Sequence, residues 1–387
     1  MAIYKKHVRP FIRNLYYFLF ALKLNILSYL LFWIRLKRVS PEQIQRILLV
    51  KTERIGDLVL TTPAIRAIRQ HFPQSNISMI VNSYTREIIE NDPNIDEVIV
   101  FDAKSSHRTL KQKIRFIKYL RSRKFDLAID LGTRNFLLLP VLLIYFSRAK
   151  ITLGLNNSGR GFLFNIKVKP YAQPRPLAEE VVSILHPLGI NTSDMQPKLY
   201  LSEEDKNYSD RLFKEMSIGE KDLLVGIHPG GYFETLHWTR EGYAKVADHL
   251  IQEHGAKVFL VGGPKDKDLA AKIKDLMENK PINLVSQTSL GQLMALISRC
   301  QLFIGGSSGP LNIALGFDVP TVSFLGPSIP ERWRPQGEKH VVFRKDLPCS
   351  PCDSGYCYQK NIECMEGITP QEVIDAADKQ LQGFARE

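Results

Sequence analysis

The segment Arg54–Asp57 places residue types that could do chemistry just after a strand-like run. It follows the apolar residues Ile47–Val50 and precedes a helical pattern from Leu58 to Arg69. A carboxylate is thereby placed at the carboxyl end of a first strand, which is where ligands bind in open α/β sheets. A carboxylate there can accept a proton from an incoming hydroxyl. The alternative is that Asp57 only caps the following helix, and the segment alone does not separate the two.

Three loops in the second half of the chain are built from small residues that follow strand-like runs. Small residues let backbone amides approach a phosphate, and the dipole of a following helix favours its negative charge. Glycines that simply turn tight corners are the alternative, but three such loops in one unit favour a phosphate-bearing ligand. The loops are His228–Gly231 (with Gly230, and leading to His237 and Trp238), Gly262–Pro264 (with Gly263, and leading to Asp266), and Gly305–Pro310.

Individual side chains in these loops each have a second interpretation. Backbone amides at Ser307, Ser308 and Gly309, ahead of Pro310, could stabilise a departing anion. His237 equally fits a packing role beside the tryptophan, and Asp266 fits a helix cap better than a contact to a ribose hydroxyl. Neither a Walker lysine motif nor a G-x-G-x-x-G with a following acid occurs, which disfavours an ATPase or a dehydrogenase.

The elements that must position these residues alternate as strand and helix. This alternation predicts an α/β fold of doubly wound parallel sheets. The predicted strands are 47–50, 77–81, 98–101, 127–130, 151–155, 223–228, 258–262, 282–284, 302–305 and 321–325. The predicted helices are 58–71, 84–90, 108–122, 239–254, 266–279, 289–299, 309–316 and 369–383.

The pattern restarts after a polar, proline-bearing stretch at 169–222, and 387 residues suit two domains. Two Rossmann-like units facing a cleft would hold one substrate each. The predicted segments are 1–40 (membrane anchor), 44–200 (first Rossmann-like domain), 205–345 (second Rossmann-like domain) and 346–387 (cysteine loop and final helix).

Positive charge is concentrated in two acid-free blocks. The formal net charge is +12, and residues 1–40 and 104–124 hold many of the basic residues and no acid. Such blocks indicate an anionic partner, either a membrane surface or a nucleic acid. No RNA-binding motif is visible, so nucleic acid is not expected. In the helix at 108–122 an apolar stripe (Leu110, Ile114, Ile117 and Leu120) is predicted to face the core, and its charges face either solvent or the same membrane.

The N-terminal segment favours the membrane. Residues 15–34 are long enough to span a bilayer, but Lys23 and Asn25 in the middle make a span costly. Flanking basic residues and aromatics favour a helix lying in an anionic interface, with a true span and a buried helix as alternatives.

Through these motifs the chain from about residue 46 to 380 resembles glycosyltransferase family 9, the lipopolysaccharide heptosyltransferases. The resemblance is carried by segments 54–69, 228–238, 261–266, 308–333 and 349–364. It implies a GT-B fold and an inverting transfer of heptose or a related sugar from a nucleotide-diphosphate sugar to a lipid-linked glycan, such as the lipopolysaccharide core, at the cytoplasmic face of the bacterial inner membrane.

The resemblance also implies roles for residues. Asp57 matches the family's base, and Arg54 and Gly56 stand on the acceptor side. No Asp-x-Asp metal motif stands out within the three small-residue loops, so no catalytic metal is expected. The residues expected to bind the donor are His228, Gly230, His237, Trp238, Gly263, Asp266, Ser307, Ser308, Gly309, Pro310 and Asn312.

Three positions depart from the family pattern. Leu236 stands where the family usually has lysine, Ser307 where it has aspartate, and Asn312 where it has histidine. These changes predict altered donor specificity, with a non-catalytic nucleotide-sugar-binding or assembly protein as the alternative.

Four of the five cysteines lie within 16 residues of one another, at Cys349, Cys352, Cys357 and Cys364. The C-x2-C pair suits one metal ion, and a structural zinc loop is one interpretation of the four. Free or redox-labile thiols are the other, because cytosolic chemistry disfavours stable disulfides.

Overall fold

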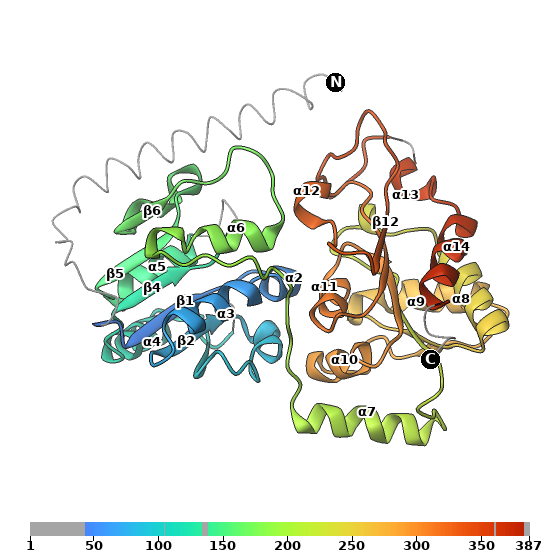
Figure 1. The fold of residues 1–387 in the computed structure, drawn as a ribbon, viewed down its shortest axis with the longest axis horizontal. Coiled ribbons are helices and arrows are strands. Elements are labelled where there is room, and N and C mark those ends of the chain that lie inside the picture. Colours follow the sequence, from blue (N-terminus) through green and yellow to red (C-terminus); the bar gives the residue numbers. More distant parts are fainter. Residues whose placement is uncertain (1–42, 104, 134–137, 360, 383–387) are drawn as a thin grey trace.

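Two parallel six-stranded sheets, joined by a long connection, form the body of the molecule (Figure 1). The computed structural model describes residues 43–382 except 104, 134–137 and 360. The predicted membrane anchor at 1–40 lies outside these residues. Within them, no helix is both long and apolar enough to cross a bilayer.

The first sheet has the strand order β3-β2-β1-β4-β5-β6. In its register Val50 at the end of β1 pairs with Ile80 and Asp130, so the carboxyl ends of three strands meet at one edge. The strands are β1 (Arg46–Val50), β2 (Asn76–Val81), β3 (Glu97–Val100), β4 (Leu127–Asp130), β5 (Ile151–Leu155) and β6 (Ile166–Val168).

Helices cover both faces of this sheet. One buried apolar cluster unites the sheet with α3 and α6, and another unites it with α4 and α5. The first cluster continues into the second half through Leu199, Leu311 and Ile313, so apolar packing joins the two halves. The elements are α2 (Ile55–Val59), α3 (Thr62–His71), α4 (Leu110–Ser122), α5 (Leu139–Ser147), α6 (Leu177–Ser183) and the 3-10 turns η3 (Ser83–Ile88), η4 (Asn157–Leu163) and η5 (His186–Leu188).

The second sheet has the order β12-β11-β10-β7-β8-β9. Its strands are β7 (Leu224–His228), β8 (Lys257–Leu260), β9 (Ile282–Asn283), β10 (Leu302–Gly306), β11 (Thr321–Phe324) and β12 (His340–Phe343). Its helices are α7 (Glu203–Glu215), α8 (Arg240–His254), α9 (Lys267–Leu276), α10 (Leu290–Ile297), α11 (Gly309–Gly316), α12 (Pro330–Trp333), α13 (Glu363–Glu366) and α14 (Pro370–Leu381), with 3-10 turns η6 (Glu234–Leu236) and η7 (Pro264–Asp266).

The prediction of two doubly wound units is confirmed, but several elements differ. The helix predicted at 58–71 is two helices, because Thr61 turns back to bond the Asp57 carbonyl and Pro63 starts α3. The helix predicted at 84–90 is the 3-10 turn η3, and the stretch 169–222 contains α6 and α7.

The apolar stripe predicted to bury one side of α4 is wrong in its first half. Leu110 is 73% exposed and Ile114 is 46% exposed, whereas Phe116 and Leu120 are buried. The helix meets the core mainly through its second half, because only those two side chains are fully covered by the sheet.

Candidate active site between the two halves

Asp57 is buried inside the short helix α2, at the carboxyl end of the central strand β1. Only 2% of the residue is exposed, and its backbone carbonyl accepts a hydrogen bond from Thr61 Oγ1 at 2.7 Å. The helix is preceded by Arg54 at its N-cap, and no side chain caps it. The alternative that Asp57 is the N-cap residue of the following helix does not fit, because Arg54 holds the N-cap position and Asp57 lies within the first turn of α2.

The N-termini of α2 and α11 meet across the two halves. A Cβ atom placed on Gly56 would lie 2.7 Å from Asn312 Nδ2, and one placed on Gly309 would lie 3.1 Å from Ile55 Cγ2. Asn312 is buried, and its Nδ2 donates to the Ser308 carbonyl at 2.8 Å. The segment carrying the candidate base thus packs directly on the loop that opens α11.

The loop before α2 contains a buried ion pair that the sequence analysis missed. Lys51 Nζ lies 2.5 Å from Glu53 Oε2, and both side chains are fully buried. Lys51 also donates to the Leu131 carbonyl at 2.9 Å, while Glu53 Oε1 accepts from the Thr133 amide at 3.2 Å. These contacts tie the loops after β1 and β4 together. The available signal was a pair of charged residues, Lys-x-Glu, directly after a buried strand.

A second buried pair, Arg160 with Asp130, lies at the same edge of the sheet. Arg160 also donates to the Gly132 carbonyl at 3.0 Å, and the Gly132 amide donates to Asp130 at 2.9 Å. Burial raises the pKa of Asp130 above its ordinary value despite the opposing charge of Arg160. Both pairs fix the backbone around the candidate acceptor side.

In the second half, His228 of the first small-residue loop contacts Ser308 of the third loop and Asp266, which follows the second. Its Nδ1 lies 3.0 Å from Ser308 Oγ, and its Nε2 lies 3.5 Å from Asp266 Oδ2. The Gly263 amide donates to the same Asp266 oxygen at 2.8 Å. Burial raises the pKa of Asp266, but the hydrogen bonds from His228 and Gly263 outweigh it, and the net pKa is lowered.

Asp266 stands at the N-cap position of α9 but makes no side-chain bond to that helix. Its side chain instead caps the preceding 3-10 turn η7 through the Gly263 amide. The expected helix cap is thus displaced by one turn, and the same carboxylate also contacts His228.

Loop packing also explains why these residues are small. A Cβ atom on Gly230 would lie 2.1 Å from Asp266 Oδ1, and one on Gly306 would lie 2.7 Å from the Leu236 carbonyl oxygen. A side chain at either position would push neighbouring loops apart, so the glycines are required for the three loops to converge.

One predicted amide donor is already used within the sheet. The Ser307 amide donates to the Phe324 carbonyl at 3.2 Å, so it is not directed at a ligand, and that prediction is wrong. Ser308 is the N-cap of α11 and makes no side-chain capping bond; its hydroxyl faces His228 instead. The helix then begins with Gly309 and Pro310.

His237 and Trp238 have different environments. Trp238 is 2% exposed, stacks on Phe324 with ring centroids 4.7 Å apart, and donates its Nε1 hydrogen to the Ile368 carbonyl at 2.9 Å. These contacts place it in the core of the second half. The Nε2 atom of His237, by contrast, is buried without a hydrogen-bond partner in the structure.

Two arginines cross between the halves. The Arg54 guanidinium lies 3.3 Å above the Tyr232 ring, in the loop that leads to Leu236. Arg332 of α12 pairs with Glu180 of α6 and donates to Thr133 Oγ1 at 2.8 Å. Arg54 was expected on the acceptor side, and its side chain reaches across to Tyr232 and Phe233 of the second half.

The four C-terminal cysteines surround the turn after β11. Ser350 Oγ donates to the Gly326 carbonyl at 2.8 Å, and the Asp353 amide donates to the Pro327 carbonyl at the same distance. All five cysteines are free thiols, and among the described residues no three sulfurs have the mutual spacing of metal ligands. The segment also bonds the donor-side loop, since Thr235 Oγ1 donates to the Ser354 carbonyl at 2.9 Å.

One group of side chains does have metal-ligand spacing in the described part of the chain. His249 and His254 of α8 both contact Asp378 of α14, at 2.9 and 2.8 Å. The group lies on elements away from the site and fastens the C-terminal helix to its neighbour.

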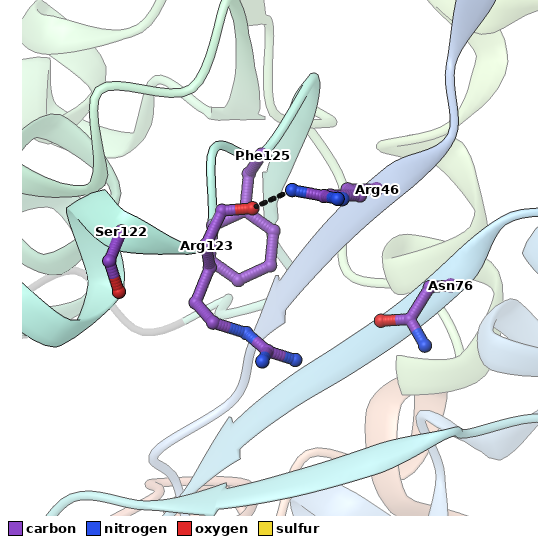
Figure 2. A pocket seen from close by; sticks show the side chains of 5 residues that line it. All are labelled: Arg46, Asn76, Ser122, Arg123 and Phe125. Atoms are coloured by element: carbon purple, nitrogen blue, oxygen red, sulfur yellow. Dashed lines mark hydrogen bonds between the residues drawn. The ribbon is translucent and has the colours of Figure 1, made fainter.

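A hollow of about 360 Å³ lies at the opposite edge of the first sheet (Figure 2). Arg46 Nη1 donates to the Arg123 carbonyl there at 3.0 Å, and Asn76 also lines it. Because Arg46 begins β1 whereas Asp57 follows its end, this hollow is separate from the candidate site.

Known proteins that are similar in sequence and fold identify the family of this chain. The sequence model of glycosyltransferase family 9 (heptosyltransferase) matches residues 113–363. Lipopolysaccharide heptosyltransferase 3 of Escherichia coli K12 is 30% identical over 345 residues, covering 84% of this chain and 95% of that protein. The family 9 glycosyltransferase of Veillonella parvula superposes with a TM-score of 0.77 at 24% identity, covering 90% of this chain and 100% of that one. The structure of the E. coli heptosyltransferase WaaC with ADP superposes with a TM-score of 0.68 at 16% identity. This match covers 87% of this chain and 100% of that one. With two facing Rossmann-like halves and a family match over more than half its length, this chain belongs to glycosyltransferase family 9, the heptosyltransferases.

Proposed function

We propose that this glycosyltransferase moves heptose or a related sugar, with inversion, from an ADP-linked donor to a lipid-linked lipopolysaccharide core at the cytoplasmic face of the inner membrane. The observation that carries the proposal is the packing of the Asp57 segment on the N-terminus of α11 through Gly56 and Asn312. A base and a diphosphate site must lie on either side of one anomeric carbon, and this contact brings their backbones together.

In the proposed reaction an acceptor hydroxyl attacks the anomeric carbon from the face opposite the diphosphate. The new carbon–oxygen bond forms as the bond to the diphosphate oxygen breaks, and Asp57 takes the hydroxyl proton. A positioned general base contributes on the order of 10²–10⁴-fold to the rate. No step in this scheme needs a metal ion.

The departing diphosphate gains negative charge, and the second half offers groups to stabilise it. We assign this role to the Gly309 amide at the N-terminus of α11, the Ser308 hydroxyl and the His237 imidazole. His237 supports the assignment because its buried Nε2 has no hydrogen-bond partner in the structure. Arg54, lying over Tyr232, supplies positive charge near the position where Leu236 replaces the family's lysine.

The ADP moiety is proposed from the relatives. The E. coli WaaC structures contain ADP and ADP-2-deoxy-2-fluoro heptose. Ser307 and Asn312 flank the N-terminus of α11, so we expect their changes to alter which donor is accepted, in its sugar or in its nucleotide.

A panel of nucleotide sugars tests the function. Thermal shift of the purified full chain identifies the donor, and transfer to lipopolysaccharide acceptors truncated at successive core sugars identifies the hydroxyl. The proposal requires a donor that both binds and turns over. Binding of a nucleotide sugar without turnover on every acceptor would instead establish the alternative, a non-catalytic sugar-nucleotide-binding protein.

A further inference from the structure

Helix α4 presents apolar and basic side chains to solvent on one surface. Leu110 and Ile114 are 73% and 46% exposed and lie four residues apart, on the same side of the helix. No acidic residue occurs in α4. Its exposed basic side chains are Lys111, Lys113, Arg115, Lys118 and Arg121.

The neighbouring helix α5 extends this surface. The Arg121 side chain donates to the Phe146 carbonyl at 3.0 Å, so the two helices lie side by side over one face of the first sheet. Leu139 and Leu142 of α5 are only partly buried. The α4–α5 surface, defined by these two helices, is therefore an apolar strip bordered by positive charge.

The position of the α4–α5 surface relates it to the candidate site. Strand β3 ends at Val100, and α4 begins soon after it, at Leu110. In a parallel sheet the helix that follows a strand begins at the carboxyl edge, so Leu110 lies at the same edge as Asp57. A flat partner on this surface would lie beside the acceptor half.

The charge of the surface selects its partner. Two copies of the chain meeting through α4 would bring like charges together, which disfavours a symmetric dimer. An anionic leaflet attracts the lysines and arginines, while leucine and isoleucine side chains enter the boundary between headgroups and acyl chains.

We propose that the α4–α5 surface docks on an anionic phospholipid bilayer, with Leu110 and Ile114 inserted below the headgroups. The docking itself stands independently of the reaction, whereas the presentation of a lipid-linked acceptor to Asp57 rests on the proposed function.

The site of insertion is tested with tryptophan as a depth probe in the full chain. Leu110→Trp is compared with Leu276→Trp, at a leucine on α9 in the other half that is 48% exposed. On vesicles of phosphatidylethanolamine and phosphatidylglycerol carrying brominated acyl chains, we expect added quenching in Leu110→Trp only. Equal quenching in the two variants would overturn the proposal, whatever other segment binds the vesicle.

The charge requirement is tested with matched triple variants. Replacing Lys111, Lys113 and Lys118 with glutamine is expected to abolish the quenching seen in Leu110→Trp. The affinity of α4 for the vesicle should fall roughly 100-fold, because each basic residue contributes about fivefold. The control replaces Lys267, Lys272 and Lys274 of α9 and should leave the quenching unchanged. Bilayer docking would be refuted if quenching persisted in the α4 triple variant. It would also be refuted if sedimentation analysis showed a dimer of the wild type that the triple variant does not form.

Transfer assays separate this proposal from the reaction. The α4 triple variant should lose transfer to vesicle-embedded acceptor and keep transfer to a delipidated, soluble core oligosaccharide. Absence of wild-type transfer to both acceptors would count against the proposed function, while the quenching measurement would still decide the docking.

Discussion

Gly56 of the first half faces Asn312 of the second so closely that a methyl group on Gly56 would lie 2.7 Å from the Asn312 amide nitrogen. Asn312 is one of the three positions that depart from the family pattern. The contact therefore connects the segment of the candidate base with the segment proposed to bind the donor.

We predict that Gly56→Ala impairs transfer and stability through this contact alone. The added methyl group must displace Asn312 Nδ2 from the Ser308 carbonyl, which costs about 1 kcal/mol for the lost hydrogen bond. A double-mutant cycle with Asn312→Ala measures the coupling by chemical denaturation and initial rates. In the Asn312→Ala background Gly56→Ala should be nearly neutral; an unchanged loss there would show that the helix α2, and not the contact, needs the glycine.

Arg332 is predicted to hold the two halves together through its contacts with Glu180 and Thr133. Its removal leaves the largely buried Glu180 without this partner and is expected to cost about 1–3 kcal/mol. Small-angle scattering should show Arg332→Ala to be more extended on average. The matched control is Lys339→Ala, which breaks a pair whose side chains are both more than half exposed and is worth about 0–1 kcal/mol. Equal effects of the two variants would contradict this role for Arg332.

We predict that acid weakens the contacts by which Asp266 holds Gly263 and His228. Because the pKa of Asp266 in the folded protein is below its ordinary value of 3.8, ionised Asp266 stabilises the fold above that pH, and this stabilisation is lost as the pH falls through the lowered value. The difference in unfolding free energy between wild type and Asp266→Asn should thus be constant near neutral pH and shrink in acid. Asp275→Asn, on an exposed part of α9, is the control. A difference that grows on acidification would have the wrong sign.

The thiols are predicted to divide into reactive and protected classes. Burial raises the pKa of Cys300 to about 12 and that of Cys364 to about 11, and the thiolate is the reactive species. Mass mapping after alkylation should find label on the three exposed cysteines, Cys349, Cys352 and Cys357, and none on the other two until unfolding. One zinc ion per chain, with exposed thiols that react only after chelation, would instead establish the zinc alternative.

Parts of the fold could be predicted because the information is local. Apolar runs such as 127–130 and 151–155 match their strands, and the restart after 222 matches the second sheet. The missed helix α7 carried a readable signal, since Ser202 caps it ahead of three acidic residues. The missed edge strands β6 and β12 are short, and edge strands carry a weak periodic signal.

The candidate site was less predictable because its contacts join distant segments. Asp57 could be identified from its place after β1. That Asp266 bonds Gly263 and His228, and that Trp238 bonds Ile368, depends on how separate loops converge in space. The exposure of Leu110 likewise depends on where α4 crosses the sheet, which periodicity does not fix.

The most direct test of the account is Asp57→Asn, which keeps the size of the side chain and removes the base. Transfer from the donor identified by the nucleotide-sugar panel and calorimetric binding of the nucleotide should be measured on the same preparation. We predict a loss of transfer on the order of 10²–10⁴-fold with nucleotide binding unchanged. Wild-type turnover in Asp57→Asn would contradict the assignment of Asp57 as the general base.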